Sequence, residues 1–393
     1  MAGQASFDVA VLGAGAAGLM CALTAGGRGR RVVVLEHAEA AGKKILISGG
    51  GRCNFTNLHT APACFHSADS QFATSALSQY APADFLALVR RHGIAWHEKT
   101  LGQLFCDGSA RAIVAMLLAE CEAAGVEIRL GARVAEVSGA APFRIEAGGR
   151  SLTAGSLVLA TGGLSIPKMG ASGFSLDLAR RFGLAVVPTA PALVPLTLAP
   201  DALARTGGLS GVALPVVAQC NGAAFPEALL FTHRGLSGPA ILQISSCWRS
   251  GQTIALDLLP ALAEDFLRAR KRERPKAGLR AVLAEALPQR VADAFVPAEL
   301  AARKISELGD KVLDGLVRGL KAWQVSPAGT EGYARAEVMR GGVDTAALSP
   351  RTMGAVGVPG LFVVGEAVDV TGWLGGYNFQ WAWASGWCAG MAA

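Results

Sequence analysis

The strongest chemical signal in the sequence is three glycines followed by one acid. Gly13, Gly15 and Gly18 have the spacing G-x-G-x-x-G, and Glu36 follows the last of them by 18 positions. Gly13 permits a tight turn, Gly15 lets a pyrophosphate approach the backbone, and Gly18 permits close helix–strand packing. A carboxylate at this distance can accept hydrogen bonds from both ribose hydroxyls and would repel a 2′-phosphate. The pattern therefore predicts a site for an adenine dinucleotide.

The elements around these glycines agree with that prediction. An apolar run at 7–12 leads into the turn, a helix is expected from Ala16 to about Ala25, and a second strand at 31–35 delivers Glu36. The free N–H groups at the start of such a helix, which include those of Ala16 and Ala17, point their positive dipole end at phosphates. This strand–turn–helix–strand order predicts a Rossmann-like α/β fold.

A second glycine-rich stretch covers residues 42–54. Its bare backbone can lie against a flat ligand, its basic side chains can neutralise phosphate or an electron-rich ring, and its polar side chains can bond to the edge of a heterocycle. A basic glycine loop can also be an ordinary surface loop. The residues expected to contact a cofactor here are Lys43, Lys44, Ser48, Gly49, Gly50, Arg52, Cys53 and Asn54.

The stretch 42–54 resembles the signature of the BaiN-like, or aminoacetone-oxidase-like, FAD-binding flavoproteins. The similarity continues through 161–167, 191–196, the FTHRGLSGP loop at 231–239 and the C-terminal Gly-Glu and Gly-Gly-Tyr-Asn motifs, so it covers nearly the whole chain. It implies a Rossmann-like domain of the two-dinucleotide-fold flavoprotein type that carries an inserted small β-barrel and a helical subdomain. It also implies FAD as the cofactor.

The resemblance implies further cofactor contacts. A backbone near Val134 would hold the adenine, and the Ala-Thr-Gly-Gly turn would pass close to the cofactor. The Gly-Glu strand end would bind the ribityl chain, and the start of the last helix would place its positive end at the flavin pyrimidine and stabilise reduced flavin. These positions are Val134, Thr161, Gly162, Gly365, Glu366, Gly376, Tyr377 and Asn378.

Prolines at 188, 191 and 195 mark a domain boundary. We expect residues 1–189 and 343–393 to form the FAD-binding domain, residues 190–260 and 326–342 a β-barrel substrate domain, and residues 261–325 a helical insertion. The apolar spacing between 81 and 125 predicts helix.

Two side chains are candidates for catalysis. His233 is the only histidine after position 97 and could face a substrate, although a lone loop histidine is more often structural. Trp373 precedes Gly375-Gly376 and could line the active site, although the four tryptophans of this region could equally form core.

Composition narrows the class of protein. Hydrophobic residues make up 51% of the 393 positions, which excludes disorder. The eight cysteines include no C-x-x-C pair, the N-terminus lacks a basic leader, and no uninterrupted apolar run reaches 18 residues. We therefore expect a cytoplasmic protein with no metal site and no membrane association. Oligomeric state cannot be predicted.

The main functional hypothesis is an FAD-dependent oxidoreductase that transfers a hydride between flavin N5 and a small organic substrate. The resemblance favours reduction of an unsaturated ketone with NADH or NADPH as the electron donor. Because the sequence contains only one dinucleotide fingerprint, this donor would bind transiently at the flavin and not in a domain of its own. A flavin-dependent amine oxidase is an alternative. A third alternative is a redox sensor that uses Cys53. The absence of a second cysteine nearby that could form a disulfide with it argues against this role.

A different class of alternative is an RNA-binding, tRNA-modifying flavoprotein. The net charge is +6, and six cations crowd into one helical segment that either is a solvated face or binds an anionic partner. They are Arg268, Arg270, Lys271, Arg272, Arg274 and Lys276.

Overall fold

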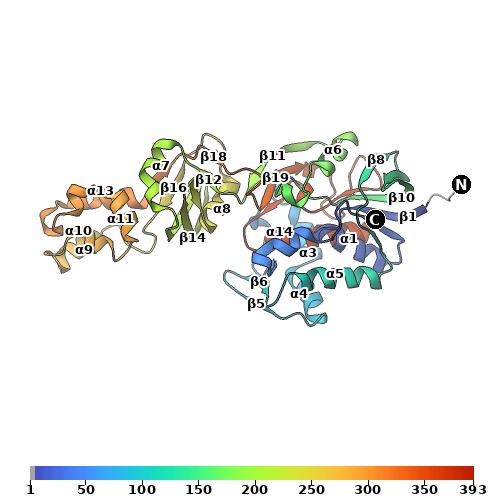
Figure 1. Cartoon of the computed structure of the whole chain (residues 1–393), viewed down its shortest axis with the longest axis horizontal. Coiled ribbons are helices and arrows are strands. Elements are labelled where there is room, and N and C mark those ends of the chain that lie inside the picture. Colours follow the sequence, from blue (N-terminus) through green and yellow to red (C-terminus); the bar gives the residue numbers. More distant parts are fainter. Residues whose placement is uncertain (1–4) are drawn as a thin grey trace. The chain divides into compact units, whose positions relative to one another are not determined.

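A computed structural model describes residues 5–393; residues 1–4, on which the expectation about the leader partly rests, lie outside the described residues. The chain divides into two compact units, one made of residues 1–190 with Val338–Ala393 and one of Pro191–Glu337 (Figure 1). The further division of the second unit into a barrel and a helical insertion stays a prediction.

The first unit is built on a seven-stranded sheet in which β20 pairs with β10 and the other strands have the order β7-β2-β1-β10-β9-β8. Neighbouring strands from β7 to β10 are parallel, as are β10 and β20, whereas β8 and β9 are antiparallel to their neighbours. This confirms the predicted α/β fold class. The strands are β1 (Ala5–Leu12), β2 (Val32–Leu35), β7 (Glu127–Arg129), β8 (Val134–Ser138), β9 (Phe143–Ala147), β10 (Arg150–Leu159) and β20 (Leu361–Val363).

The core of this unit lies between the sheet and its helices α1 (Ala16–Gly27), α5 (Arg111–Ala123) and α14 (Tyr377–Ala392). The α1–α14 packing is close because α14 presents glycines to α1. A Cβ at Gly386 would lie 2.4 Å from the Ala17 carbonyl oxygen, and one at Gly390 would lie 2.6 Å from that of Cys21.

The expectation of helix throughout 81–125 is wrong in its middle. Helices α4 (Pro82–Arg91) and α5 are separated by the hairpin strands β5 (Trp96–Glu98) and β6 (Gln103–Cys106), and β6 pairs with β3 (Asn54–Asn57). Leu101 and Gly102, both with positive φ, make the hairpin turn and break any helix. The apolar residues with helical spacing lie in α4 and α5, whereas β5 (Trp-His-Glu) has no apolar period of its own.

Smaller elements complete the first unit. They are α2 (Lys43–Ile47), β4 (Phe65–His66), α3 (Phe72–Gln79), α6 (Phe174–Arg181), β11 (Val186–Ala192), β19 (Val338–Val343) and β21 (Thr371–Gly372). Strand β11 pairs with β19 and β21 with β4.

The second unit contains a seven-stranded antiparallel sheet in the order β17-β16-β13-β14-β15-β12-β18. Helix α8 (Pro239–Cys247) packs against β13 and β14, and the other helices are α7 and α9 to α13. The strands are β12 (Leu196–Thr197), β13 (Ala213–Cys220), β14 (Ala223–Thr232), β15 (Gly235–Ser237), β16 (Ile254–Asp257), β17 (Trp323–Val325) and β18 (Gly329–Thr330). The helices are α7 (Pro200–Thr206), α9 (Phe266–Glu273), α10 (Leu279–Leu283), α11 (Gln289–Phe295), α12 (Ala298–Ala301) and α13 (Asp310–Lys321).

Residues 5–393 were compared with the requirements of a membrane-spanning helix and of a metal site. No helix among them combines the length and apolar character needed to cross a bilayer. No group of three or more His, Cys, Asp or Glu side chains among them could hold a metal ion.

Candidate functional site

The three glycines after β1 serve different physical purposes. Gly13 has φ +107°, and a Cβ there would lie 2.6 Å from the Ala160 carbonyl oxygen, while one at Gly18 would lie 2.0 Å from that of Gly13. A Cβ at Gly15 would meet no heavy atom within 4 Å, and its φ of −85° suits any residue. Packing within the chain therefore explains Gly13 and Gly18 but leaves room at Gly15. That room at the start of α1 fits a pyrophosphate.

Glu36 is fixed beside the glycine turn. Its Oε2 accepts a hydrogen bond from the Ala14 amide (2.8 Å) and its Oε1 accepts one from the Ala38 amide (2.9 Å). The side chain is 12% exposed. His37 Nδ1 also lies 3.0 Å from Oε1, and since a carboxylate offers about four acceptor positions, Oε2 keeps one for a ribose hydroxyl. The structure thus places the predicted acid next to the turn, although Glu36 lies 22 residues after Ala14 in the sequence.

The second glycine loop lies against the first turn. The Gly42 amide donates to the Ala14 carbonyl (2.8 Å), and Gly42 has φ +68° with Val114 only 2.7 Å from where a Cβ would be. Gly49 and Gly50 also have positive φ and are exposed. Lys43 is half-buried and Arg52 is exposed. The Gly42 contact therefore places the start of this loop beside the dinucleotide turn, and contact of the loop with a cofactor stays a prediction.

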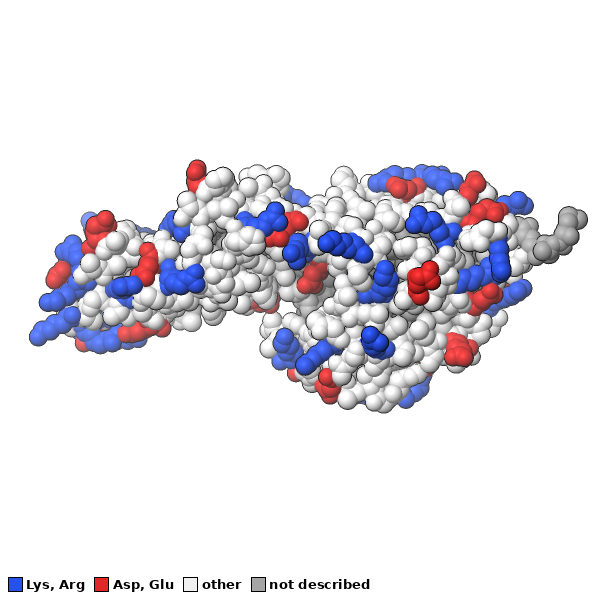
Figure 2. All heavy atoms as spheres, viewed as in Figure 1, with Lys and Arg blue, Asp and Glu red and all other residues white. Residues whose placement is uncertain are grey.

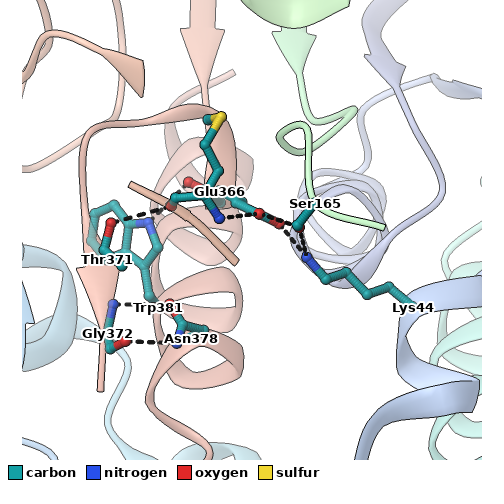
Figure 3. Close-up of polar contacts among 9 residues, drawn as sticks. Lys44, Ser165, Glu366, Thr371, Gly372, Asn378 and Trp381 are labelled. Carbon is teal, nitrogen blue, oxygen red and sulfur yellow. Dashed lines mark hydrogen bonds and ion pairs between the residues drawn. The ribbon is translucent and has the colours of Figure 1, made fainter. Parts of the chain in front are cut away.

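Three side chains from distant parts of the chain form a polar cluster (Figure 3). Lys44 Nζ lies 2.6 Å from both Ser165 Oγ and Glu366 Oε2, and Ser165 Oγ donates to Glu366 Oε1 (2.7 Å). The Met339 amide also donates to Glu366 Oε1 (2.8 Å). The carboxylate is thereby held in one orientation.

This cluster leaves capacity for a ligand at Lys44. An ammonium group has three donors, and two of them are engaged by Ser165 and Glu366. The Lys44 side chain is 39% exposed, against 19% for Glu366. Sequence reasoning missed Ser165, which is separated from Lys44 by 121 residues and from Glu366 by 201. No local spacing signals such a contact.

The Ala-Thr-Gly-Gly turn adjoins the cluster. A Cβ at Gly162 (φ +77°) would lie 3.9 Å from Glu366 Oε2, and one at Gly163 would lie 3.1 Å from Glu366 Oε1. Thr161 Oγ1 shares a hydrogen bond with Ser175 Oγ (2.6 Å). Val134 lies apart from these residues on β8, opposite Ala147 of β9.

The C-terminal motif is positioned by tight packing. Gly365 (φ +66°) would place a Cβ 2.9 Å from that of Ala17, so the end of β20 lies against the start of α1. Asn378 accepts a hydrogen bond from the Gly372 amide and donates to the Gly372 carbonyl, both at 2.9 Å (Figure 3). These bonds fix the turn that precedes α14.

The start of α14 also lies against the second glycine loop. Gly376 caps the helix with φ +97°, and a Cβ there would lie 2.4 Å from the Thr56 carbonyl oxygen. With its amide oxygen toward Gly376, Asn54 accepts from the Gly376 amide (3.3 Å). Tyr377 is buried, with its ring edge-on to Phe65. The helix N-terminus thus adjoins the loop expected to meet the flavin.

Cys53 is buried beside this loop, and burial raises the pKa of its thiol to about 12. Ser48, whose hydroxyl donates to the Ile45 carbonyl, lowers that pKa in part. The reactive form of cysteine is the thiolate, so this environment opposes a redox role.

We expect iodoacetamide at pH 8 to label Cys53 in the native protein roughly 10³ times more slowly than after unfolding, because burial raises the pKa of its thiol from about 9 to about 12. Mass spectrometry of the Cys53 peptide over time measures this ratio, and the unfolded chain is the control. Labelling of native Cys53 at the unfolded rate would revive the redox-sensor hypothesis.

The two catalytic candidates belong to different units. His233 is exposed in the β14–β15 turn, where Thr232 Oγ1 accepts from the Arg234 and Gly235 amides. Trp373 is half-buried, its amide donates to the Cys64 carbonyl (3.0 Å), and its ring lies edge-on to that of Tyr377 (6.1 Å). Their catalytic roles stay predictions. Of the other C-terminal tryptophans, Trp381 and Trp383 are core residues.

This chain is similar to known proteins along nearly its whole length. The model of the family described as "HI0933-like protein Rossmann domain" matches residues 7–392. Ribosomal RNA dihydrouridine synthase of Escherichia coli is 49% identical over 388 residues, which cover 98% of this chain and 97% of that protein. The Haemophilus influenzae protein of the same name is 42% identical over 97% of both chains.

Two other proteins are similar along almost their full length. 3-Dehydro-bile acid Δ(4,6)-reductase of Clostridium scindens is 30% identical over 98% of both chains. A solved structure of 3-ketosteroid-Δ4-(5α)-dehydrogenase from Rhodococcus jostii RHA1 covers 99% of this chain and 98% of that one with a TM-score of 0.50. At 15% identity, this last similarity concerns the fold alone.

Proposed function

The chain belongs to the HI0933-like Rossmann family of FAD-dependent oxidoreductases, and from that premise we propose that it reduces a uridine of ribosomal RNA to dihydrouridine. The family assignment confirms the resemblance stated from the sequence. The observation that carries the proposal is the 49% identity, over nearly the full length of both chains, to a protein named for that reaction.

The proposed reaction falls in a class that the sequence already suggested. The 5,6 double bond of uracil is conjugated to the 4-carbonyl group, as the double bond of an unsaturated ketone is conjugated to its own carbonyl. Reduction adds a hydride at C6 and a proton at C5. The name of the Clostridium scindens relative also describes reduction at carbon–carbon double bonds. The proposal therefore keeps the predicted chemistry and replaces a small molecule with RNA.

The chain's own residues would bind and orient the reactants. The room at Gly15 and the start of α1 would receive the pyrophosphate of FAD, and Glu36 the adenosine ribose. Bound FAD, once reduced, supplies the hydride at N5. The remaining N–H of Lys44 and the N-terminus of α14 would stabilise negative charge next to them.

Delivery of the proton at uracil C5 is also part of the proposal. His233 is proposed as a catalytic residue, because an imidazole can act as a general acid. Trp373 is proposed to line the space for the base. NADH or NADPH is proposed as the donor of the two electrons.

The oxidative half-reaction tests this function. The flavin is reduced anaerobically with NADH, NADPH or dithionite, and the enzyme is mixed with ribosomal RNA transcribed in vitro and hence unmodified. We expect the visible band of oxidised flavin to return with this RNA and not with RNA that already contains dihydrouridine at the target. Return with a simple conjugated ketone but not with RNA would contradict the proposal, and bleaching of oxidised flavin by amines would indicate an amine oxidase.

A further inference from the structure

The cations of the helical segment 261–325 fall into two groups, those that form ion pairs with carboxylates and those that form none. The segment holds thirteen Lys and Arg against nine Asp and Glu, and Figure 2 shows the two signs interspersed where the helices α9 to α13 lie in Figure 1. Eight of these cations form ion pairs with carboxylates. Within residues 5–393, the five that form none are Lys276, Arg290, Lys304, Lys311 and Arg318.

The crowded cations of α9 mainly hold the helices together. Lys271 bonds to Asp310 of α13 (2.8 Å) and Arg268 pairs with Asp314 (3.0 Å). Arg274 pairs with Glu285, and this contact lowers the pKa of the Glu285 carboxyl. Charge density in the sequence therefore overstates how many of these groups can bind a partner.

Two lysines without ion pairs lie at or beside an isolated antiparallel bridge. Gly278 and Lys304 form this bridge, in which the Leu279 amide donates to the Arg303 carbonyl (2.9 Å) and the Ile305 amide to that of Ala277 (2.8 Å). Lys276 precedes the bridge in a turn, where the Ala277 amide donates to the Arg274 carbonyl (3.0 Å).

The bridge is anchored in the core, because Leu279 and Ile305 are completely buried. Lys276 and Lys304 are both exposed. The bridge and the turn before it therefore hold the backbone of two exposed cations next to buried anchors.

Helix α13 adds a second pair. Asp310 and Asp314 face α9, whereas Lys311 and Arg318 are exposed and seven residues apart, which places them on one helix face with a rise of about 10.5 Å between them. Gly315 carries no side chain, and Asp314, three residues from Lys311 and four from Arg318 on the same helix face, is paired with Arg268 (3.0 Å).

We propose that these four cations, Lys276, Lys304, Lys311 and Arg318, bind the phosphate backbone of the RNA substrate. The inference rests on the proposed function, which supplies the polyanion. Two features support it: the four cations form no ion pair within residues 5–393, and their side chains are exposed. Phosphate contacts of this kind hold a nucleic acid without reading its sequence.

The test compares the wild type with Lys276→Gln/Lys304→Gln, titrated with unmodified ribosomal RNA at several salt concentrations. Loss of two phosphate contacts is expected to lower the slope of log affinity against log salt by about 1.4 for a single strand. Lys311→Gln/Arg318→Gln should lower it similarly, and FAD content should stay unchanged in both.

The matched control is Arg144→Gln/Arg150→Gln, which removes two exposed cations of β9 and β10 that have no ion pair within residues 5–393. This variant lowers the net charge by the same amount as each test variant. Its slope of log affinity against log salt should equal that of the wild type. A wild-type slope in both test variants would overturn the inference, as would binding to assembled ribosomal particles but not to RNA alone. Dihydrouridine formation by the wild type would still uphold the proposed function in either case, whereas its absence would contradict that function separately.

Discussion

Gly15→Val should give a folded protein that has lost most of its affinity for FAD. The φ of −85° accepts valine without strain, and no atom of the chain lies within 4 Å of the new Cβ. The side chain would instead fill the room assigned to the pyrophosphate. Overfilling a packed site costs about 2–3 kcal/mol, which corresponds to about 30- to 150-fold weaker binding.

Titration of the apo-protein with FAD, followed by flavin fluorescence, measures this loss, and urea unfolding of the apo-protein should show no change beyond about 0.5 kcal/mol. Gly27→Val is the matched control, because Gly27 belongs to the same helix and also has open space around it. It should bind FAD like the wild type. Wild-type affinity in Gly15→Val would show that the room at this turn does not hold the cofactor.

Gly386→Ala should destabilise the first unit by about 1–3 kcal/mol, although alanine is ordinarily the better helix former by up to about 1 kcal/mol. The sign reverses because the new methyl group would lie 2.4 Å from the Ala17 carbonyl oxygen, and backbone cannot move aside as a flexible side chain can. Separation of α14 from α1 would also displace Gly365, which lies against Ala17, so FAD binding should weaken as well.

Urea unfolding of the apo-protein, read from tryptophan fluorescence of α14, measures the effect. Gly27→Ala provides the comparison within the same unit, since its Cβ would meet no atom within 4 Å and should be neutral or slightly stabilising. Equal stability of Gly386→Ala and wild type would mean that α1 and α14 pack less closely than described.

The sequence could predict the features that depend on local spacing. Gly13, Gly15, Gly18 and Glu36 lie within one strand–turn–helix–strand unit, so the order of residues nearly determines their geometry. The Rossmann-like fold class followed from them and is confirmed. The basic glycine loop pointed to Lys44 and the C-terminal Gly-Glu motif to Glu366 as separate cofactor contacts, and their role with FAD stays a prediction.

Features set by long-range packing could not be predicted. Ser165 joins Lys44 to Glu366 across separations of 121 and 201 residues, which no periodicity encodes. The β5–β6 hairpin was missed because apolar residues with helical spacing flank it in α4 and α5, and its strands of three and four residues are too short to show a period of their own. The cations between 268 and 276 were candidates for an anionic partner, but the structure places Asp314, Asp310 and Glu285 against three of them, Arg268, Lys271 and Arg274.

The central claim is that this flavoenzyme makes dihydrouridine in ribosomal RNA, and its most direct test is analysis of the product. Unmodified ribosomal RNA is incubated with the FAD-loaded protein and an electron donor, digested to nucleosides and examined by mass spectrometry. The account predicts a nucleoside heavier than uridine by two hydrogen atoms, formed with the wild type and strongly reduced with Gly15→Val. RNA left without dihydrouridine, although the enzyme-bound flavin is reduced, would contradict it.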